Sequence, residues 1–156
     1  RFDFKLVGKK EMLIPYSNYE ALFHATEDKL MPPKHINPDY LRWELHRVWV
    51  VEATLKPGLR HIYSKRFFYF DEDWSGSGAS DEYDAAGKLY KGFFALNAQL
   101  YDSQVTSPLS FFGYDLATWN YAVGSIFIGP GNMFVLDQLL PANMFTPDGL
   151  VARSKQ

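Results

Sequence analysis

Residues 41–55 read LRWELHRVWVVEATL and residues 61–71 read HIYSKRFFYFD, with KPGL at 56–59 in the segment between them. Apolar and polar residues alternate along the first stretch, which is the two-residue period of a β-strand with one apolar face. Proline presets φ and glycine accepts a left-handed conformation, so KPGL favours a tight turn. The sequence therefore predicts a long hairpin, Leu41–Leu55 with His61–Phe70, turning at Pro57-Gly58.

A four-residue loop would fix the register of this hairpin and place Trp49 opposite Arg66 and Arg47 opposite Phe68. The first strand would have 15 residues, well above the usual length of about five or six. Long strands of this kind are typical of strongly curved sheets. We therefore expect a mainly β fold, a curved antiparallel sheet forming an open or incomplete barrel, with a few short helices.

The rest of the chain adds further strands and little helix. An alternating segment opens the chain at Phe2–Leu6, and another strand is expected to run from a turn at 85–87 to about Tyr101. A weak repeat, Tyr-Asp-x-Ala-x3-Tyr, begins at Tyr83 and again at Tyr114, which we interpret as a repeated hairpin unit. Capping-box spacing predicts a short helix over roughly residues 18–28, and residues 119–128 form the last predicted strand.

Composition limits the possible functions. The chain has 156 residues, 27 of them aromatic, a net charge of −2 and no cysteine. We interpret residues 1–156 as a single β-rich domain. The charge argues against a nucleic-acid-binding protein with a broad basic face, and the lack of thiols excludes disulfides and thiolate metal sites. No apolar run is long enough to span a bilayer.

Motifs for catalysis and cofactor binding are missing from the sequence. It contains no nucleophile elbow, P-loop or G-x-G-x-x-G, so we expect a protein that is not an enzyme and needs no cofactor. The histidines never fall in a metal-ligand spacing. The predicted register places His46 opposite Tyr69 and His61 opposite Thr54, so no metal site is expected. Asp71-Glu72-Asp73 is read as a solvated acidic loop.

One arginine is the anomaly of the predicted hairpin. Arg47 interrupts an apolar face that we expect to be concave and covered, and a buried guanidinium needs an acceptor. Two interpretations remain open: an ion pair with an acid such as Glu11 or Asp84, or a site for an anionic or amphipathic ligand. In the second case the arginine pair would receive a head group, and cation–π contacts would contribute. The candidate ligand-binding residues are Trp43, Arg47, Trp49, Arg66 and Phe68.

Several stretches resemble a known family. They are Lys5–Met12 and Ile14-Pro15-Tyr16, then residues 37–56 (NPDYLRWELHRVWVVEATLK), His61–Arg66, Phe70–Asp73 and finally residues 142–147 (ANMFTP). The chain is similar to uncharacterised periplasmic proteins usually called outer-membrane lipoprotein-sorting-like proteins. The resemblance covers most of the chain and is weaker between residues 103 and 140. Because family members are about twice this length or more and start with a secretion signal, we expect the C-terminal part of a longer carrier-like protein.

The resemblance implies a function as well as a fold. Proteins of this type are thought to have a curved, incompletely closed antiparallel sheet, helices over its concave side and a hydrophobic cavity between them. That implies a non-catalytic binding or carrier module for a lipid or other hydrophobic ligand in the periplasm of a Gram-negative bacterium. The alternative is an accessory protein that docks a resistance-nodulation-division type exporter or an outer-membrane component. A dimer through an exposed sheet edge is also possible.

Overall fold

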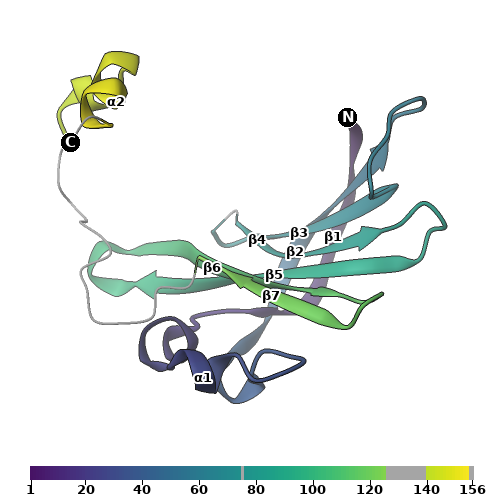
Figure 1. The fold of residues 1–156 in the computed structure, drawn as a ribbon, viewed down its shortest axis with the longest axis horizontal. Coiled ribbons are helices and arrows are strands. Elements are labelled where there is room, and N and C mark those ends of the chain that lie inside the picture. Colours follow the sequence, from purple (N-terminus) through teal and green to yellow (C-terminus); the bar gives the residue numbers. More distant parts are fainter. Residues whose placement is uncertain (75, 126–139, 155–156) are drawn as a thin grey trace.

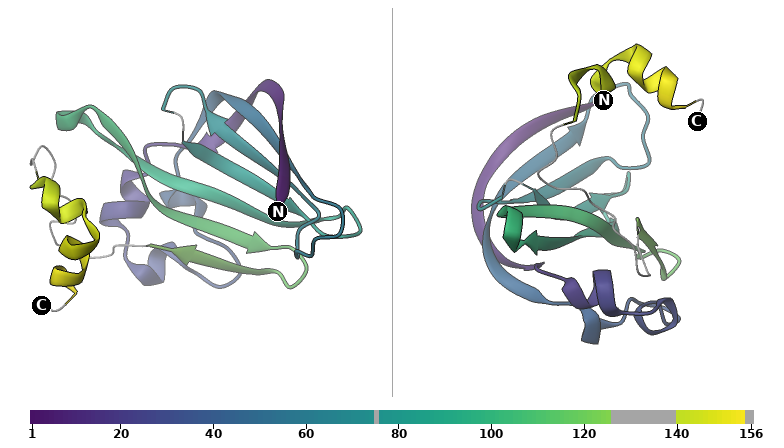
Figure 2. Two further views of the ribbon diagram at one scale, coloured as in Figure 1. Left: turned by 90° about the horizontal axis from the view of Figure 1, so that it is seen from above. Right: turned by 90° about the vertical axis from the view of Figure 1, so that its left-hand side faces the viewer.

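The computed structural model describes residues 1–74, 76–125 and 140–154. Seven antiparallel strands lie in the sheet in the order in which they occur in the chain, and the sheet does not close into a barrel (Figure 1). They are β1 (Phe2–Pro15), β2 (Trp43–Leu55), β3 (Lys65–Asp71), β4 (Ser77–Tyr83), β5 (Leu89–Leu100), β6 (Val105–Asp115) and β7 (Asn120–Gly124). Seen end-on, β1 and β2 form an arc (Figure 2). The predicted mainly β, curved and open sheet is confirmed.

Helices are few and short in the described residues. They are the π-helical turn η1 (Glu20–His24), α1 (Glu27–Leu30), the 3-10 turns η2 (Pro38–Tyr40), η3 (Tyr101–Ser103) and η4 (Ala142–Phe145), and α2 (Pro147–Arg153). The single helix predicted near residues 18–28 is therefore two separate turns. Thr146 caps α2 by accepting from the Gly149 N–H at 3.1 Å. No helix in this part of the chain has the length and apolar character needed to cross a membrane.

The predicted hairpin is present, with a longer connection than expected. Gly58 has φ +79° and the Leu59 N–H donates to the Lys56 carbonyl at 3.2 Å, so the turn lies where the sequence placed it. However, β3 begins at Lys65 rather than at residue 61. The pairs are accordingly shifted by four residues, and the predicted register was wrong because residues 60–64 form a loop instead of continuing the strand.

Two turns confirm the repeated hairpin unit. The Asp84 carboxylate accepts from the Ala86 and Lys88 N–H groups at 2.9 Å, between β4 and β5. The Asp115 carboxylate accepts from the Ala117 and Thr118 N–H groups at 3.0 and 3.1 Å, between β6 and β7. An aspartate that binds its own turn fixes the turn locally. Residues 126–128 of the last predicted strand lie outside the described residues.

The two faces of the sheet differ in what lies against them. On β2, Val48 is fully buried, whereas Trp49 is 36% and Leu45 64% exposed. We call the side of Val48 the covered face and the side of Trp49 the open face. The expectation that the apolar face with Trp43, Leu45, Trp49 and Val51 is covered was wrong. The chain instead covers the opposite face, with residues 16–42 and the second half of β1.

Two clusters form the core on the covered face. One lies between the end of β1 and strands β2–β4 and contains Ile14, Tyr16, Val48, Val50, Tyr69 and Ala79. The other joins the helical segment to β5 and β6 and contains Ala21, Leu22, Ala25, Leu30, Ile36, Leu96, Ala98, Leu109 and Phe112. The segment with α1 accordingly lies on one side of β5–β7, while the β2–β3 hairpin rises on the other side (Figure 1).

A buried asparagine ties the end of β1 to β5. The Asn97 side chain accepts from the Ser17 N–H at 2.9 Å and donates to the Pro15 carbonyl at 3.4 Å. Its backbone carbonyl accepts from the Asn18 N–H at 2.8 Å. Each of these groups would be costly to bury unpaired. Asn97 therefore holds β1 across the covered face and maintains the curl of the sheet.

Candidate ligand-binding face

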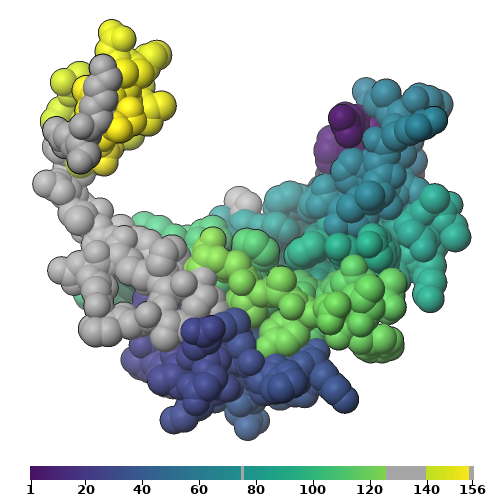
Figure 3. Space-filling model, in the orientation of Figure 1, coloured from purple at the N-terminus to yellow at the C-terminus, as the bar shows by residue number. Residues whose placement is uncertain are grey.

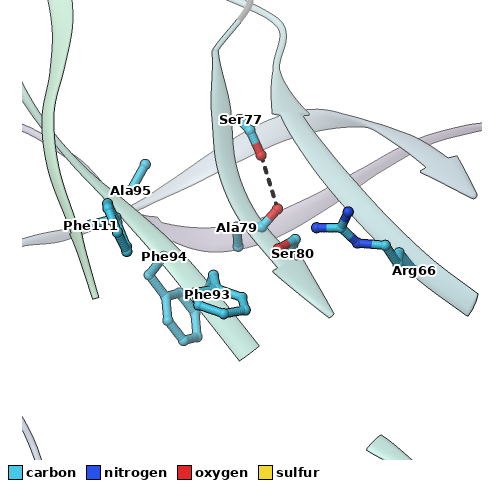
Figure 4. A pocket seen from close by; sticks show the side chains of 8 residues that line it. All are labelled: Arg66, Ser77, Ala79, Ser80, Phe93, Phe94, Ala95 and Phe111. Atoms are coloured by element: carbon cyan, nitrogen blue, oxygen red, sulfur yellow. Dashed lines mark hydrogen bonds between the residues drawn. The ribbon is translucent and has the colours of Figure 1, made fainter. Parts of the chain in front are cut away.

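Aromatic and aliphatic side chains gather on the open face around a shallow pocket. The pocket has a volume of about 320 Å³ and lies over β3–β6 (Figure 4). Its lining residues are Arg66, Ser77, Ala79, Ser80, Phe93, Phe94, Ala95 and Phe111. A second open pocket of about 370 Å³ is lined by Leu6, Trp49, Val51, Phe70 and Asp71. The molecule is hollowed above these strands, beside the rising hairpin (Figure 3).

Two glycines explain how the aromatic rings of the first pocket lie. Phe93 pairs with Gly113 of β6, and Phe111 pairs with Gly124 of β7. A Cβ atom on Gly113 would lie 2.4 Å from the Phe93 ring, and one on Gly124 would lie 2.3 Å from the Phe111 ring. The rings therefore lie against the neighbouring strand in space that only glycine leaves free. The result is a flat apolar surface beside the polar groups of β3 and β4.

Arg66 belongs to a buried ion pair at the edge of this pocket. Its Nε and Nη2 atoms both donate to the Glu82 carboxylate, the second at 2.8 Å, and the Ser80 hydroxyl donates to the same carboxylate at 3.0 Å. Glu82 is fully buried. The guanidinium also lies 4.5 Å from the centre of the Phe68 ring. The bidentate pair and the ring fix the guanidinium, so Arg66 has a structural partner.

Arg47 has a different partner on the exposed part of the same face. It donates to Glu72, which also accepts from Lys9. The Lys9 ammonium and the Arg47 guanidinium hold the pKa of the Glu72 carboxyl below its ordinary value. The Lys9 ammonium lies 4.0 Å from the centre of the Trp49 ring, within the range of a cation–π contact. Glu72, rather than Glu11 or Asp84, is the acid bound to Arg47.

The structure places Arg47, Trp49, Arg66 and Phe68 on the open face of β2 and β3 but does not bring the five predicted site residues together. Trp49 lies opposite Phe70 rather than Arg66, and Phe68 lies opposite Val51 rather than Arg47. Arg66 lies opposite Ala53, which separates it from Arg47 by six positions along β2, roughly 20 Å at ~3.3 Å per residue. Trp43 lies at the start of β2 and packs edge-on against Phe94, with ring centres 5.5 Å apart.

Arg47 and Arg66 each have an acid within ion-pair distance. An anionic head group between them was expected only if both lacked such an acid, so this expectation does not apply. The aromatic members remain available on the open face. The assignment of Trp43, Arg47, Trp49, Arg66 and Phe68 to ligand binding stays a prediction. Phe93 and Phe111 were not predicted as members of this surface. Their position depends on the pairing of β5 with β6, and the alternation within each strand did not show which face they occupy.

The covered face holds a polar cluster that sequence reasoning also missed. His46 of β2 lies 3.2 Å from Asp71 and 3.4 Å from Asp73, measured from its Nδ1 atom to a carboxylate oxygen of each. The predicted register placed Tyr69 opposite His46. With the observed shift of four residues, Val48 pairs with Asp71, which brings the acids next to the imidazole. These are the described residues that could hold a metal ion.

Fold and surface together define a class: an open antiparallel meander with one face packed against its own helical segment and one apolar face that the described residues leave uncovered. The chain belongs to the DUF1329 family, a family of proteins of unknown function whose profile matches residues 1–151. It is 46% identical over 122 residues to "Uncharacterized protein PA3922" of Pseudomonas aeruginosa, covering 78% of this chain and 27% of that protein. The chain thus spans about a quarter of that relative's length.

Two solved structures resemble the chain. A DUF1329 family protein from Desulfovibrio piger aligns with a TM-score of 0.50 at 14% identity, over 96% of this chain and 47% of that one. A domain assigned as an outer membrane lipoprotein-sorting protein, from Vibrio parahaemolyticus, aligns with a TM-score of 0.45 at 12% identity, over 96% and 48%. The predicted family resemblance is confirmed. At 14% identity, the likeness to the Desulfovibrio piger structure shows the fold alone.

Proposed function

We propose that this chain is a non-catalytic, carrier-like module of the Gram-negative periplasm that binds an acyl chain or another hydrophobic molecule on its open face. The observation that supports it is an apolar surface that the described residues leave uncovered, with two open pockets on it. Phe4, Leu6, Leu45, Trp49 and Phe111 are exposed there. Contiguous apolar patches of this kind mark ligand, protein or membrane contacts in soluble proteins.

The shape of the surface favours a ligand that lies flat. The Phe93 and Phe111 rings form a flat apolar surface, and two shallow pockets of about 320 and 370 Å³ lie on either side of Phe68–Phe70. Their volumes fall within the ~300–1,000 Å³ typical of small-molecule sites. Both pockets are open to solvent, so a bound chain would stay partly accessible, as release to a partner requires.

Native mass spectrometry of the protein purified from its own envelope tests this proposal. We expect a retained lipid on the wild-type protein and on Phe145→Asp, whose phenylalanine is exposed in η4 away from the sheet. Phe111→Asp places a charge on the apolar surface and should lose the lipid. Equal retention by both variants, or no lipid on the wild type at all, contradicts the proposal.

A second candidate is an accessory protein that docks an envelope transporter or outer-membrane component. The observation that favours it is β1, a 14-residue edge strand whose Phe4, Leu6 and Val7 are exposed. Such an edge can pair with another chain, a second copy included, although lysines along it oppose this. A protein partner retained without lipid in the same experiment supports this candidate.

A further inference from the structure

Three side chains from separate segments converge on the covered face. His46 comes from β2, Asp71 ends β3 and Asp73 lies in the loop before β4. The Nδ1 atom of His46 is 3.2 Å from Asp71 Oδ1 and 3.4 Å from Asp73 Oδ2. One donor atom from each residue lies within 4.8 Å of those from the other two. Two carboxylates therefore face the same ring nitrogen.

In the described residues, the Asp71 side chain is partnered only by the His46 imidazole and a backbone N–H. Its side chain is fully buried, and its Oδ2 atom has no hydrogen-bond partner. Its Oδ1 atom accepts from the Asp73 N–H at 3.1 Å. In the described ranges, no lysine or arginine forms an ion pair with Asp71 or Asp73. An unpaired buried carboxylate is costly, and a second carboxylate beside it adds repulsion.

The imidazole is held in place from its other side. The Tyr16 ring stacks on it, with centres 4.2 Å apart and planes at 26°. The Nε2 atom of His46 lies 3.6 Å from the Glu44 carboxylate, and Glu44 is itself paired with Arg42. Ligating histidines are usually oriented by a carboxylate near the nitrogen that does not bind the metal. With its proton on Nε2, on the side of Glu44, the neutral imidazole would present its Nδ1 lone pair to a cation held by Asp71 and Asp73.

We propose that His46 Nδ1 and the carboxylates of Asp71 and Asp73 bind one divalent cation of the zinc type. Metal–ligand bonds of ~2.0–2.2 Å place the donors of a tetrahedral site ~3.3–3.6 Å apart. The two distances from Nδ1 are close to that spacing. The cation would neutralise the buried Asp71 and connect β2 to the loop between β3 and β4.

The ligand types select the kind of cation. An imidazole nitrogen suits Zn²⁺ and similar transition ions, whereas Ca²⁺ takes about six to eight oxygen ligands. Three protein donors leave one tetrahedral position for water or another ligand. Asp73 is 73% exposed, so the cluster is open to solvent on that side. The competing interpretation is a protonated imidazole that forms ion pairs with the two acids and binds no metal.

Calorimetric titration of the full chain with Zn²⁺, after dialysis against EDTA, separates the two. We expect one Zn²⁺ per chain, a rise in melting temperature on binding, and no comparable response to Ca²⁺. Asp73→Asn should weaken Zn²⁺ binding by about tenfold or more, in line with the loss of a metal-site group. The exposed position of Asp73 leaves the fold intact, so this variant remains measurable.

Two matched variants serve as controls. Glu72→Gln removes one negative charge from the same loop but from the open face, where Glu72 contacts Lys9 and Arg47. His24→Gln removes the exposed histidine that lies 3.0 Å from Glu20. Both should bind Zn²⁺ as the wild type does. The proposal is overturned by absence of stoichiometric binding to the wild type, or by equal losses in Asp73→Asn and either control.

Discussion

The two faces of β2 are buried in the reverse order of their apolar character in the sequence. Trp43, Leu45 and Trp49 form the more apolar face, yet they are exposed, whereas Val48 and Val50 on the other face are buried. Burial here is decided by which face the segment 16–42 and the second half of β1 contact. Alternation therefore locates a strand and its two faces, but it does not identify the covered one when both carry apolar residues.

The sharpest test of this comparison uses two neighbours on β6. Phe112 is 1% exposed on the covered face and Phe111 is 45% exposed on the open face. Phe112→Ala should lower the free energy of unfolding by about 3–5 kcal/mol, because it leaves a cavity in the core. Phe111→Ala should lower it by less than about 1 kcal/mol. Urea denaturation measures both, and equal losses would refute the assignment of the faces.

The next largest loss of stability is expected at the ion pair between Arg66 and Glu82. Glu82→Gln leaves the Arg66 guanidinium without a charged partner, and we expect a loss of about 3 kcal/mol in stability, as for a buried pair broken on one side. Glu72→Gln makes the same chemical change at the exposed Arg47 pair and should have a much smaller effect. Chemical denaturation of both variants is the measurement. A large loss of stability in Glu72→Gln would show that the exposure of an ion pair does not determine its contribution to stability here.

A smaller effect is expected at the glycine below Phe93. Gly113→Ala brings a methyl group to 2.4 Å from the ring, so the ring must move into the pocket at a cost of about 1–2 kcal/mol. Gly92→Ala has no atom closer than 3.9 Å to its new methyl group and should be close to neutral. Thermal melting measures the difference in stability between the two variants. Loss of the retained lipid in native mass spectrometry would show that the displaced Phe93 ring fills the pocket.

The smallest expected effect is the pH dependence of stability that arises from Glu72. The pKa of the Glu72 carboxyl is lowered in the folded state by Lys9 and then Arg47. A carboxyl with a lowered folded pKa adds stability above its unfolded pKa, and this is lost as pH falls through the folded value. The stability difference between wild type and Glu72→Gln should thus be present at pH 7, begin to decline near the ordinary pKa of 4.5 and vanish below the lowered pKa of the folded state. A difference that grows in acid would contradict this.

Strands and turns were predictable from sequence, and contacts between strands were not. The alternation of residues 41–55 and the chemistry of Pro57-Gly58 gave the hairpin, because both are local. The register depended on whether residues 60–64 continue the strand, and their composition does not decide that. A shift of four residues preserves the face of every side chain but changes its neighbours, so Arg47 and Arg66 were correctly placed on one face and wrongly placed together.

The same shift concealed the His46 cluster, which needs Asp71 rather than Tyr69 beside β2. The acidic run 71–73 was visible in the sequence, but its separation from the histidine gave no recognised metal spacing. Likewise, the flat surface made by Phe93 depends on Gly113 of the next strand. Sites formed across strands follow from register, and register follows from tertiary packing that a single sequence does not display.

The meander order of the strands has a consequence for how the chain folds. Each strand pairs with its neighbour in sequence. The connections from β2 to β7 are short and have a low entropic cost, whereas residues 16–42 separate β1 from β2. Assembly of β2–β7 can therefore proceed one strand at a time through pairings that are local in sequence. Asn97 is among the residues that join distant segments, since it bonds to residues about 80 positions earlier in the chain. Its contacts are expected to form late and to complete the curl of the sheet.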